Sequence, residues 1–593
     1  MTRTMEAAVR TGRRWKARDV WCALAGLVSL ALFIAAASSV VLPVNSDLGL
    51  AAELPYPYWI AVLVLNVTFV VALRGDSSGP AGRLVMMWLL AVQVLVLFGA
   101  AAFVTDVPRG EVAFRHLGIT DALADTQAVD PGIDAYFNWP GFFGLLATIL
   151  EATGLDPVTV ALWAPVFNVG LWLVAVAVLL SYLTPDPRRR WLALWIFCLG
   201  NWQDQDYLSP QAFGFFLYLV VAVLLIGPLG ARPSRFRGFR PANLAAWWRE
   251  RSPVDPRRGF RVGAFAVVIL LIAVICASHQ LTPFMLLMVL TVLTLSGYVW
   301  PGRLPLIAGI VLVLWLIYPA STYLAGHPPM EDAGLTAAVE SNVAERVSGT
   351  PGHVFVVQVR VVLTVLLWIL AAVGAVRDWR RGRLDLRVVL FAASPLLLFP
   401  VQMYGGEMLI RVSLFALPFV ALLACSALLP KKSSGMRPSF RTGGVLVVTF
   451  CLLAAMTVTG RFGNARYDVF TDDEMAAVAT AESMAPPGAA IIAAAHPTPW
   501  RTETYLEHPY RAIEDLCRQD LTAVTCGPAF YGYARDNPAG AVVLLMRSAE
   551  ASLVLQGDST TANMQEMEEW LQAQSGVELA FSNADARIYR VVP

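Results

Sequence analysis

Residues 188–227 read RRRWLALWIFCLGNWQDQDYLSPQAFGFFLYLVVAVLLIG, and this stretch shows how the whole chain is built. Three arginines precede an apolar run, a polar turn follows at 201–207, and a second apolar run follows the turn. As a helix, the first run (191–203) reaches only about 20 Å, which is less than the ~30 Å of hydrocarbon in a bilayer. The polar turn is therefore expected at membrane depth, where ionisable groups are costly unless they line a wet cavity.

Similar apolar blocks occur along most of the chain and predict a polytopic membrane protein. Apolar residues make up 57% of the sequence and charged residues 15%, which excludes an ordinary soluble enzyme. A spanning helix needs about 20 mostly apolar residues. We expect about 13 spans, namely the short run 191–203 and blocks near 20–42, 57–73, 84–104, 158–183, 208–230, 262–278, 284–300, 304–324, 361–376, 388–404, 412–429 and 442–460.

The distribution of basic residues predicts the orientation of these spans. Lys and Arg near span ends are retained in the cytoplasm, and basic segments alternate with acidic ones along this chain. The basic segments are the N-terminal arm, Arg74 and Arg83, 188–190, 232–261, Arg303, 377–387 and 431–441. We therefore expect a multi-pass plasma-membrane protein with a cytoplasmic N-terminus and an extracytoplasmic C-terminus. The net charge of +1 conceals this asymmetry and gives no indication of nucleic-acid binding.

The expected fold is mainly α, a transmembrane helical bundle at 1–460 followed by an extracytoplasmic α/β domain at 461–593. In the second part, short alternating patterns predict helices at 473–484 and 561–574 and strands at 489–494, 541–546, 577–581 and 586–592. Five of the seven cysteines fall within apolar spans. The other two, Cys517 and Cys526, share the C-terminal part, where either a disulfide or two unpaired thiols would be consistent with the sequence.

Function is expected in three long or polar outer segments: 105–157, 325–358 and everything after 460. The first segment contains Arg115, His116 and Asp134 and continues into interfacial aromatics that include Tyr136 and Trp139. Its apolar stretch 141–153 is too short to span and is expected to lie flat on the outer leaflet. A similar amphipathic helix is predicted at 335–347.

The polar turn and two other loop tips supply further candidate site residues. Asp204 and Asp206 could both reach one divalent cation, such as Mg or Mn, or one hydroxyl. The alternative is that the turn is a solvated loop tip that caps the next helix, which begins near Gln211. Glu407 and Arg411 are four residues apart and could form a structural ion pair or contact a substrate. His279 ends another span, but no histidine spacing matches a zinc motif.

The chain has neither a phosphate-cradling loop nor a Gly-rich nucleotide-binding turn. An enzyme that works outside the cytoplasm without such a site would draw on a donor already activated in the membrane, such as a lipid-linked sugar.

This combination of features resembles the C-type (GT-C) glycosyltransferases, such as protein O-mannosyltransferases and the lipid A aminoarabinose transferase. The resemblance lies in the many spans, the acidic first outer loop beside aromatics, the acidic next turn and the C-terminal outer domain. It implies that Asp134, with Asp106 and Asp130 as rivals, activates the acceptor, and that Asp204 or Asp206 forms a second acidic site. One departure is that the long loop follows the third span, which implies an added N-terminal hairpin.

The resemblance implies an inverting transfer of a hexose or pentose from a polyprenyl-phosphate donor to a cell-wall glycan or protein acceptor. Asp134 would act as general base. Asp204 and Asp206, with or without a metal, would assist the leaving phosphate, and the other contacts to substrate would come from Arg115, His116, Tyr136, Trp139, Gln211, His279, Glu407 and Arg411. The alternatives are a polysaccharide polymerase or ligase, a transporter or flippase, and a non-catalytic scaffold.

Overall fold

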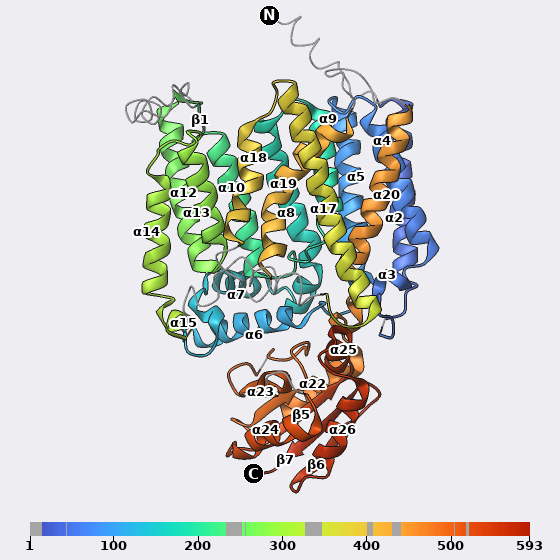
Figure 1. Ribbon diagram of the computed structural model, residues 1–593, viewed down its shortest axis with the longest axis vertical. Coiled ribbons are helices and arrows are strands. Elements are labelled where there is room, and N and C mark those ends of the chain that lie inside the picture. Colours follow the sequence, from blue (N-terminus) through green and yellow to red (C-terminus); the bar gives the residue numbers. More distant parts are fainter. Residues whose placement is uncertain are drawn as a thin grey trace, which may run out of the picture.

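The computed structural model describes residues 15–42, 44–232, 252–254, 257–326, 347–399, 407–429, 440–502, 504–517 and 521–593, apart from the side chain of Phe440. Within these ranges the chain is mainly helical. A bundle of long helices forms one part, and a small sheet with its own helices is attached to one end of the bundle (Figure 1). We call this end the domain end and the other the far end. The helix predicted at 335–347 falls almost entirely outside the described residues.

Every predicted span that the structure describes coincides with a helix. Eight helices are long and apolar enough to cross a membrane, judged by length and composition: α2 (Ala17–Ala37), α4 (Tyr56–Leu73), α5 (Pro80–Phe98), α8 (Pro157–Leu183), α12 (Arg258–Ser278), α17 (Pro351–Arg380), α19 (Met408–Leu428) and α20 (Phe440–Phe462). Five more are shorter: α9 (Pro187–Gly200), α10 (Pro210–Ile226), α13 (Thr282–Leu295), α14 (Leu304–Ile317) and α18 (Leu386–Ala393), which continues into η4 (Ser394–Leu398). The chain is a multi-pass membrane protein, and the count of thirteen spans stays a prediction.

The starts of three consecutive helices share one local signal. Asp156, Asp186 and Ser209 each precede a proline, and each side chain accepts a backbone N–H from the first turn of α8, α9 or α10. Proline is favoured at this position because its missing N–H has no helical partner there and its φ suits a helix. The sequence thus determines where each of these helices begins.

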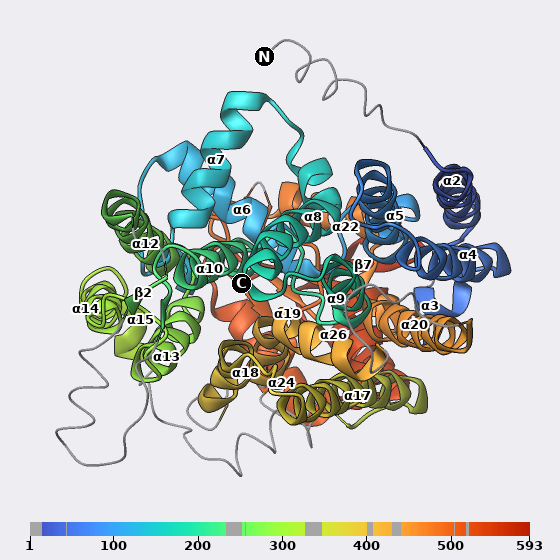
Figure 2. The ribbon, with the colours of Figure 1, turned by 90° about the horizontal axis from the view of Figure 1, so that it is seen from above.

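Two helices of the first long loop cross the domain end of the bundle. These are α6 (Glu111–Thr126) and α7 (Gly141–Thr153), with a short 3-10 turn, η2 (Ala135–Asn138), between them. Figures 1 and 2 show both helices running crosswise to the bundle axis, between the spans and the C-terminal part. The expected short apolar helix at 141–153 is therefore present and lies across the axis.

The C-terminal part contains a five-stranded mixed sheet of order β4-β3-β5-β7-β6. Strand β3 (Ala490–Ala493) pairs in parallel with β4 (Tyr510–Ala512) and β5 (Ala541–Met546), whereas β7 (Ala586–Val591) runs antiparallel to β5 and to β6 (Val577–Ser582). Every residue of β3 and β5 is buried, as expected for strands covered on both faces. The accompanying helices are α22 (Asp472–Met484), α23 (Ile513–Cys517), α24 (Ala523–Asp536), α25 (Arg547–Gln556) and α26 (Thr561–Gln572).

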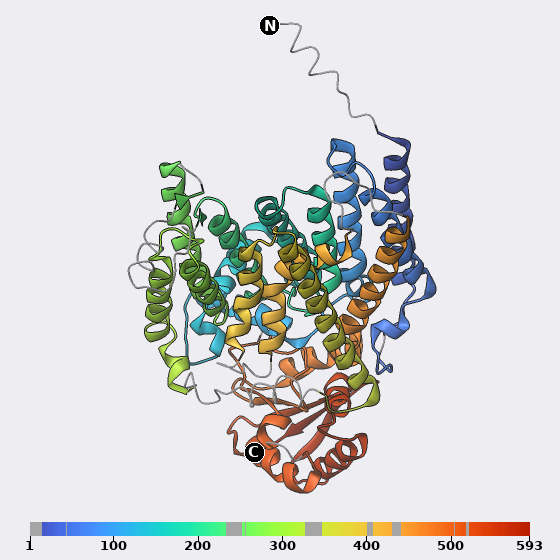
Figure 3. The same cartoon turned by 45° about the horizontal axis from the view of Figure 1, so that its top comes forward.

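The C-terminal domain is joined to the bundle by hydrogen bonds at several points. The N–H of Thr350, just before α17, donates to the carbonyl of Leu555 in α25 (3.0 Å). The N–H of Gly110, just before α6, donates to the carbonyl of Asp468 in the short helix α21 (Ala465–Asp468; 2.8 Å). Figure 3 shows the lower ends of α17 and α20 meeting this domain. Its position against α6 and α17 is therefore held by contacts distant in sequence.

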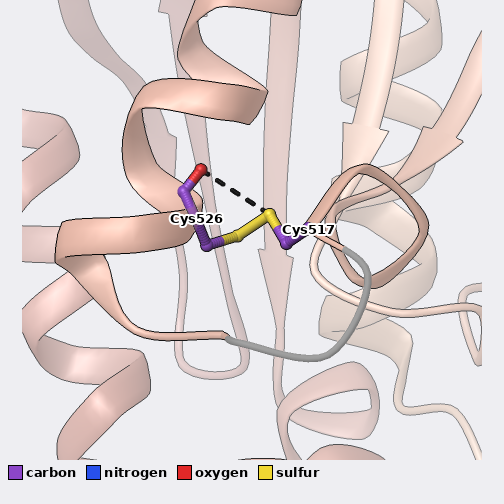
Figure 4. Close-up of a disulfide and its surroundings, with 2 residues drawn as sticks. All are labelled: Cys517 and Cys526. Atoms are coloured by element: carbon purple, nitrogen blue, oxygen red, sulfur yellow. Dashed lines mark hydrogen bonds between the residues drawn. A yellow bond between two sulfur atoms is a disulfide. The ribbon is translucent and has the colours of Figure 1, made fainter.

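Cys517 and Cys526 form a disulfide that connects α23 with α24 (Figure 4). The other five cysteines are free and lie in the bundle helices. The disulfide lies within the C-terminal domain.

Candidate active site at the domain end

The polar turn after α9 is buried inside the protein. Asn201 and Asp206 are fully buried and Gln203 nearly so. A side chain at Gly200 would collide with Leu367 of α17 and Leu417 of α19, so the absence of a Cβ there lets the end of α9 approach both helices. Although Ser209 does cap α10, the turn is not the solvated loop tip that the sequence also allowed.

Both carboxylates of this turn are paired with arginines, which the sequence analysis did not predict. Arg461, at the end of α20, donates to both oxygens of Asp206 (2.9 and 2.6 Å). Its guanidinium also lies 3.1 Å from Asp204, whose other oxygen accepts from Arg109. We call Arg109, Asp204, Asp206 and Arg461 the ionic cluster. It connects the first long loop, the turn after α9 and the end of α20.

The two aspartates of the ionic cluster differ in exposure and backbone geometry. The Asp206 side chain is 0% exposed, whereas that of Asp204 is 34% exposed. Asp204 also has a φ of 55°, in the left-handed region that side chains other than glycine seldom adopt. Such local strain persists where surrounding contacts enforce it, often at functional sites. Asp206 therefore anchors Arg461, while Asp204 is the carboxylate that a substrate could reach.

A metal does not fit between these two carboxylates as they are arranged. Each of their four oxygens lies no farther than 3.1 Å from an arginine nitrogen, so the positive charge that a cation would supply is already present. Among the described residues, no group of three or more His, Cys, Asp or Glu side chains could hold a metal. The idea that Asp204 and Asp206 share a divalent cation is therefore not supported by this geometry.

Asp134 lies in a second group of residues, beside α6. Its Oδ2 accepts from the Arg115 guanidinium and from the Tyr505 hydroxyl (2.6 Å), and its Oδ1 accepts from the N–H of Tyr136 (2.9 Å). Burial alone would raise the pKa of Asp134, but the charge of Arg115 and these hydrogen bonds hold it below its usual value. The Asp134 side chain is only 6% exposed, so little of it is open to a substrate.

The aromatic residues predicted at the interface pack around His116. The Tyr136 ring meets the His116 ring edge-on at 4.9 Å, Phe143 of α7 does so at 5.4 Å, and Tyr207 stacks at 5.8 Å. Trp139 is buried farther along and contacts Tyr323 near α14. His116 and Tyr136 are thus together, whereas Trp139 belongs to the packing of the loop against other helices.

The remaining candidates form a third group between α10, α12 and α19. Arg411 donates to Glu407 (2.6 Å) and to Gln211 of α10 (3.2 Å). His279, just after α12, is buried and bonded to Thr282. Burial raises the pKa of Tyr136, and the positive charge of Arg411 opposes this, so the second and third groups are close enough to interact. The sequence-predicted residues therefore gather at one end of the bundle in three neighbouring groups.

Arg109 and Arg461 were missed as site residues, although the sequence contains a signal for them. Both fall on the side predicted to be extracytoplasmic, where arginines at span ends are rare. A basic residue in such a place needs a compensating carboxylate or an anionic ligand. Arginines that depart from the basic-inside pattern would have been the residues to examine.

Comparison with known proteins gives limited information about this chain. No family model matches it, and no curated protein matches it. One similar solved structure is ArnT from Cupriavidus metallidurans in the apo state, with 11% identity and a TM-score of 0.47 over 86% of this chain and 97% of that chain. Another is the same protein bound to undecaprenyl phosphate, with 11% identity and a TM-score of 0.45 over 86% of this chain and 98% of that chain. The Archaeoglobus fulgidus oligosaccharyltransferase in the apo form is also similar, with 10% identity and a TM-score of 0.47 over 82% of this chain and 72% of that chain. Because these TM-scores lie below 0.5, the function has to follow from the residues of this chain.

Proposed function

We propose that this chain is a membrane glycosyltransferase that moves a hexose or pentose from a polyprenyl-phosphate donor to a cell-envelope glycan or protein. The observation that carries the proposal is the ionic cluster at the domain end. It places a strained, partly exposed carboxylate, Asp204, against two guanidinium groups at the end of the spanning helices. Transfer from a lipid phosphate needs both kinds of group at the edge of the bilayer.

In the proposed reaction, the acceptor hydroxyl attacks the anomeric carbon of the sugar. Asp204 accepts the hydroxyl proton as general base. A new carbon–oxygen bond forms while the bond from the anomeric carbon to the phosphate oxygen breaks, and the lipid phosphate leaves with the electron pair. Arg109 and Arg461 stabilise the charge that develops on that phosphate, since guanidinium groups bind phosphate oxygens in a planar, directional manner.

The geometry changes the roles first considered for the other aspartates. Asp134 was the preferred base from the sequence, but its side chain is only 6% exposed, whereas that of Asp204 is 34% exposed. We therefore propose that Asp134 positions Arg115 and that Asp206 positions Arg461. Asp106 and Asp130, exposed rivals on the same loop, stay alternative bases.

The proposed topology follows from the same reaction. Residues 1–460 form the transferase bundle and 461–593 an extracytoplasmic domain, with the N-terminus in the cytoplasm. The ionic cluster, at the domain end, then faces the outer leaflet, where a lipid-linked donor would present its sugar. Arg189 and Arg377, which both donate to Ser426 at the far end, would face the cytoplasm in agreement with the basic-inside rule.

A polysaccharide polymerase or ligase is the second candidate. Proteins of that kind use lipid-diphosphate oligosaccharides and depend on outer arginines, and the pairing of Arg109 and Arg461 with the turn supplies two such arginines. The choice between the candidates rests on the donor, since both would use this end of the bundle.

The deciding experiment supplies membranes containing the protein with radiolabelled donors of both classes and an envelope fraction as acceptor. We expect transfer from polyprenyl-phosphate sugars, and a loss of about 100-fold or more in Asp204→Asn, which keeps the shape but not the basicity of the carboxylate. Asp125→Asn, on an exposed position of α6, is the matched control and should transfer normally. Transfer only from diphosphate oligosaccharides would favour the polymerase, and full activity of Asp204→Asn would overturn the assigned base.

A further inference from the structure

Three buried polar atoms around the first turn of α7 have no hydrogen-bond partner among the described residues. They are His116 Nε2 on α6, Gln211 Nε2 on α10 and Ser278 Oγ at the end of α12. Their residues are 0%, 3% and 1% exposed. Buried polar groups nearly always have a partner, so three unsatisfied atoms from three helices indicate a place where a polar ligand or ordered water binds.

The first turn of α7 brings these three helices together. Phe143 contacts the His116 ring (5.4 Å). Gln211 accepts from Arg411 (3.2 Å), whose charge acts on Tyr136, the ring that meets His116 at 4.9 Å. A Cβ on Gly141 would lie 2.8 Å from Ser278 Oγ, so α7 approaches the end of α12 closely at this glycine. Figure 2 shows α7 running beside α6 towards α10 and α12. The unsatisfied atoms therefore surround one small region of the domain end.

The hydrogen bonds of His116 determine which of its ring nitrogens carries the proton. Nδ1 lies 2.8 Å from the carbonyl oxygen of Leu208, which can only accept, so Nδ1 carries the hydrogen. Burial lowers the pKa of His116 to about 4, so the ring is neutral at physiological pH. Nε2 then has a lone pair and acts only as an acceptor.

His279 has the opposite tautomer. Its Nδ1 accepts the backbone N–H of Thr282 (3.1 Å), so this nitrogen has no hydrogen and Nε2 carries it. The chain therefore buries, at the same end, one imidazole with a free acceptor and one with a donor. His116 and His279 are close enough that a charge on one would act on the other.

This set of atoms matches a sugar better than a phosphate. A hydroxyl group both donates and accepts, so it can satisfy the lone pair of His116 and the N–H groups of Gln211 together. A phosphate oxygen would instead be repelled by that lone pair. The rings of Tyr136, Tyr207 and Phe143 around His116 add the apolar surfaces on which the C–H face of a sugar packs.

We propose that His116, Gln211 and Ser278 form a sugar subsite, in which His116 Nε2 accepts a hydrogen bond from a sugar hydroxyl. The proposal rests on the proposed transferase function and assigns its glycosyl-recognition site to the α7 region, apart from the arginines that would hold the phosphate. His116 is a binding residue in this scheme and does not accept a proton.

The test observes His116 directly, without turnover. Protein labelled with 15N-histidine is placed in lipid nanodiscs, and the His116 signal is identified by its loss in His116→Asn. We expect a resonance with Nδ1 protonated, whose Nε2 signal shifts when one of three polyprenyl-phosphate sugars (a hexose, a pentose or an amino sugar) is added. Bare undecaprenyl phosphate should leave it unchanged. An Nε2-protonated ring, no shift with any sugar, or an equal shift with the bare lipid would overturn the proposal.

A kinetic arm separates binding from folding. The His116→Asn amide can still donate to Leu208 in place of Nδ1 but lacks the Nε2 acceptor, so we expect the donor KM to rise about 10-fold with kcat little changed. His508→Asn is the matched control, because His508 makes the same kind of Nδ1 bond to a carbonyl (Ala489, 3.1 Å) within the C-terminal domain. An unchanged KM in His116→Asn would refute the subsite while leaving the transferase intact. A sugar-dependent shift without any transfer would instead refute the transferase and keep the subsite.

Discussion

The two ends of the bundle each contain a buried cluster of arginine and aspartate, and the clusters are built differently. At the far end, Arg189 of α9 donates to Asp378 of α17 (2.9 Å) and to Ser426 of α19 (2.7 Å), and Ser426 also donates to Asp378 (2.6 Å). At the domain end, Arg461 and Arg109 hold the two aspartates of an irregular turn. Both clusters join three segments that are far apart in the sequence.

Exposure and backbone conformation distinguish the two clusters. Asp378 is 4% exposed and lies in the regular last turns of α17. Asp204 is 34% exposed, has a φ of 55° and is paired with a different arginine at each oxygen. A buried ion pair by itself is thus weak evidence of chemistry, because the same pairing also fastens helix ends. The informative feature is a carboxylate that is both held and accessible.

The largest expected effect would break or support this distinction. Asp378→Asn leaves Arg189 without its carboxylate, so we expect a loss of about 3 kcal/mol in the free energy of unfolding, with normal transfer per folded molecule. Asp204→Asn leaves Arg109 without its carboxylate and should also lower stability, but only this variant should lose transfer per folded molecule. Thermal unfolding in detergent, together with the transfer assay on the folded fraction, measures both. If Asp378→Asn abolished transfer without unfolding the protein, the far-end cluster could no longer be regarded as structural.

A smaller effect would show how far the domain end depends on the C-terminal domain. Tyr505→Phe removes the hydroxyl that donates to Asp134, and hydrogen bonds to charged groups contribute about 2 kcal/mol. We expect faster proteolysis of the segment 504–508 and a lower melting temperature. Tyr531→Phe is the control, since its exposed hydroxyl bonds only within the domain, to Ser575. Equal proteolysis of the wild type and Tyr505→Phe would mean that this contact does not hold the domain in place.

The last effect concerns pH. Burial raises the pKa of Asp468 to about 7, close to Arg109 and Asp204. The folded state therefore holds a proton that the unfolded state (pKa about 3.9) releases, and stability falls as pH rises from about 4 to 7. We expect Asp468→Asn to melt a few degrees above the wild type at pH 8 but not at pH 4. Asp536→Asn, exposed on α24, should show no such pH dependence. The same melting difference at both pH values would contradict the assigned protonation.

Secondary structure was readable from the sequence wherever a pattern was long or regular. The apolar blocks became helices, and the strands at 490–493, 541–546, 577–582 and 586–591 were predicted to within two residues of each end. The strand Tyr510–Ala512 and the helices α23, α24 and α25 were missed. Three residues are too few to show a strand period, and the five residues of α23 are too few to show a helical one. The longer α24 does have a buried face at helical spacing, which includes Ala523, Cys526 and Phe530, so this helix could have been predicted.

The sequence by itself determined that the chain is a multi-pass helical membrane protein with a C-terminal α/β domain, because burial in lipid demands long apolar runs and leaves cations at their ends. It also singled out the acidic turn, since a run as short as 191–203 predicts a polar end at membrane depth. Only the tertiary structure decided what the aspartates contact. Asp134 lies 371 residues from Tyr505 and Asp206 lies 255 from Arg461, and no periodicity records such pairings. Whether a carboxylate is free to react depends on those partners, so its role is set by the fold.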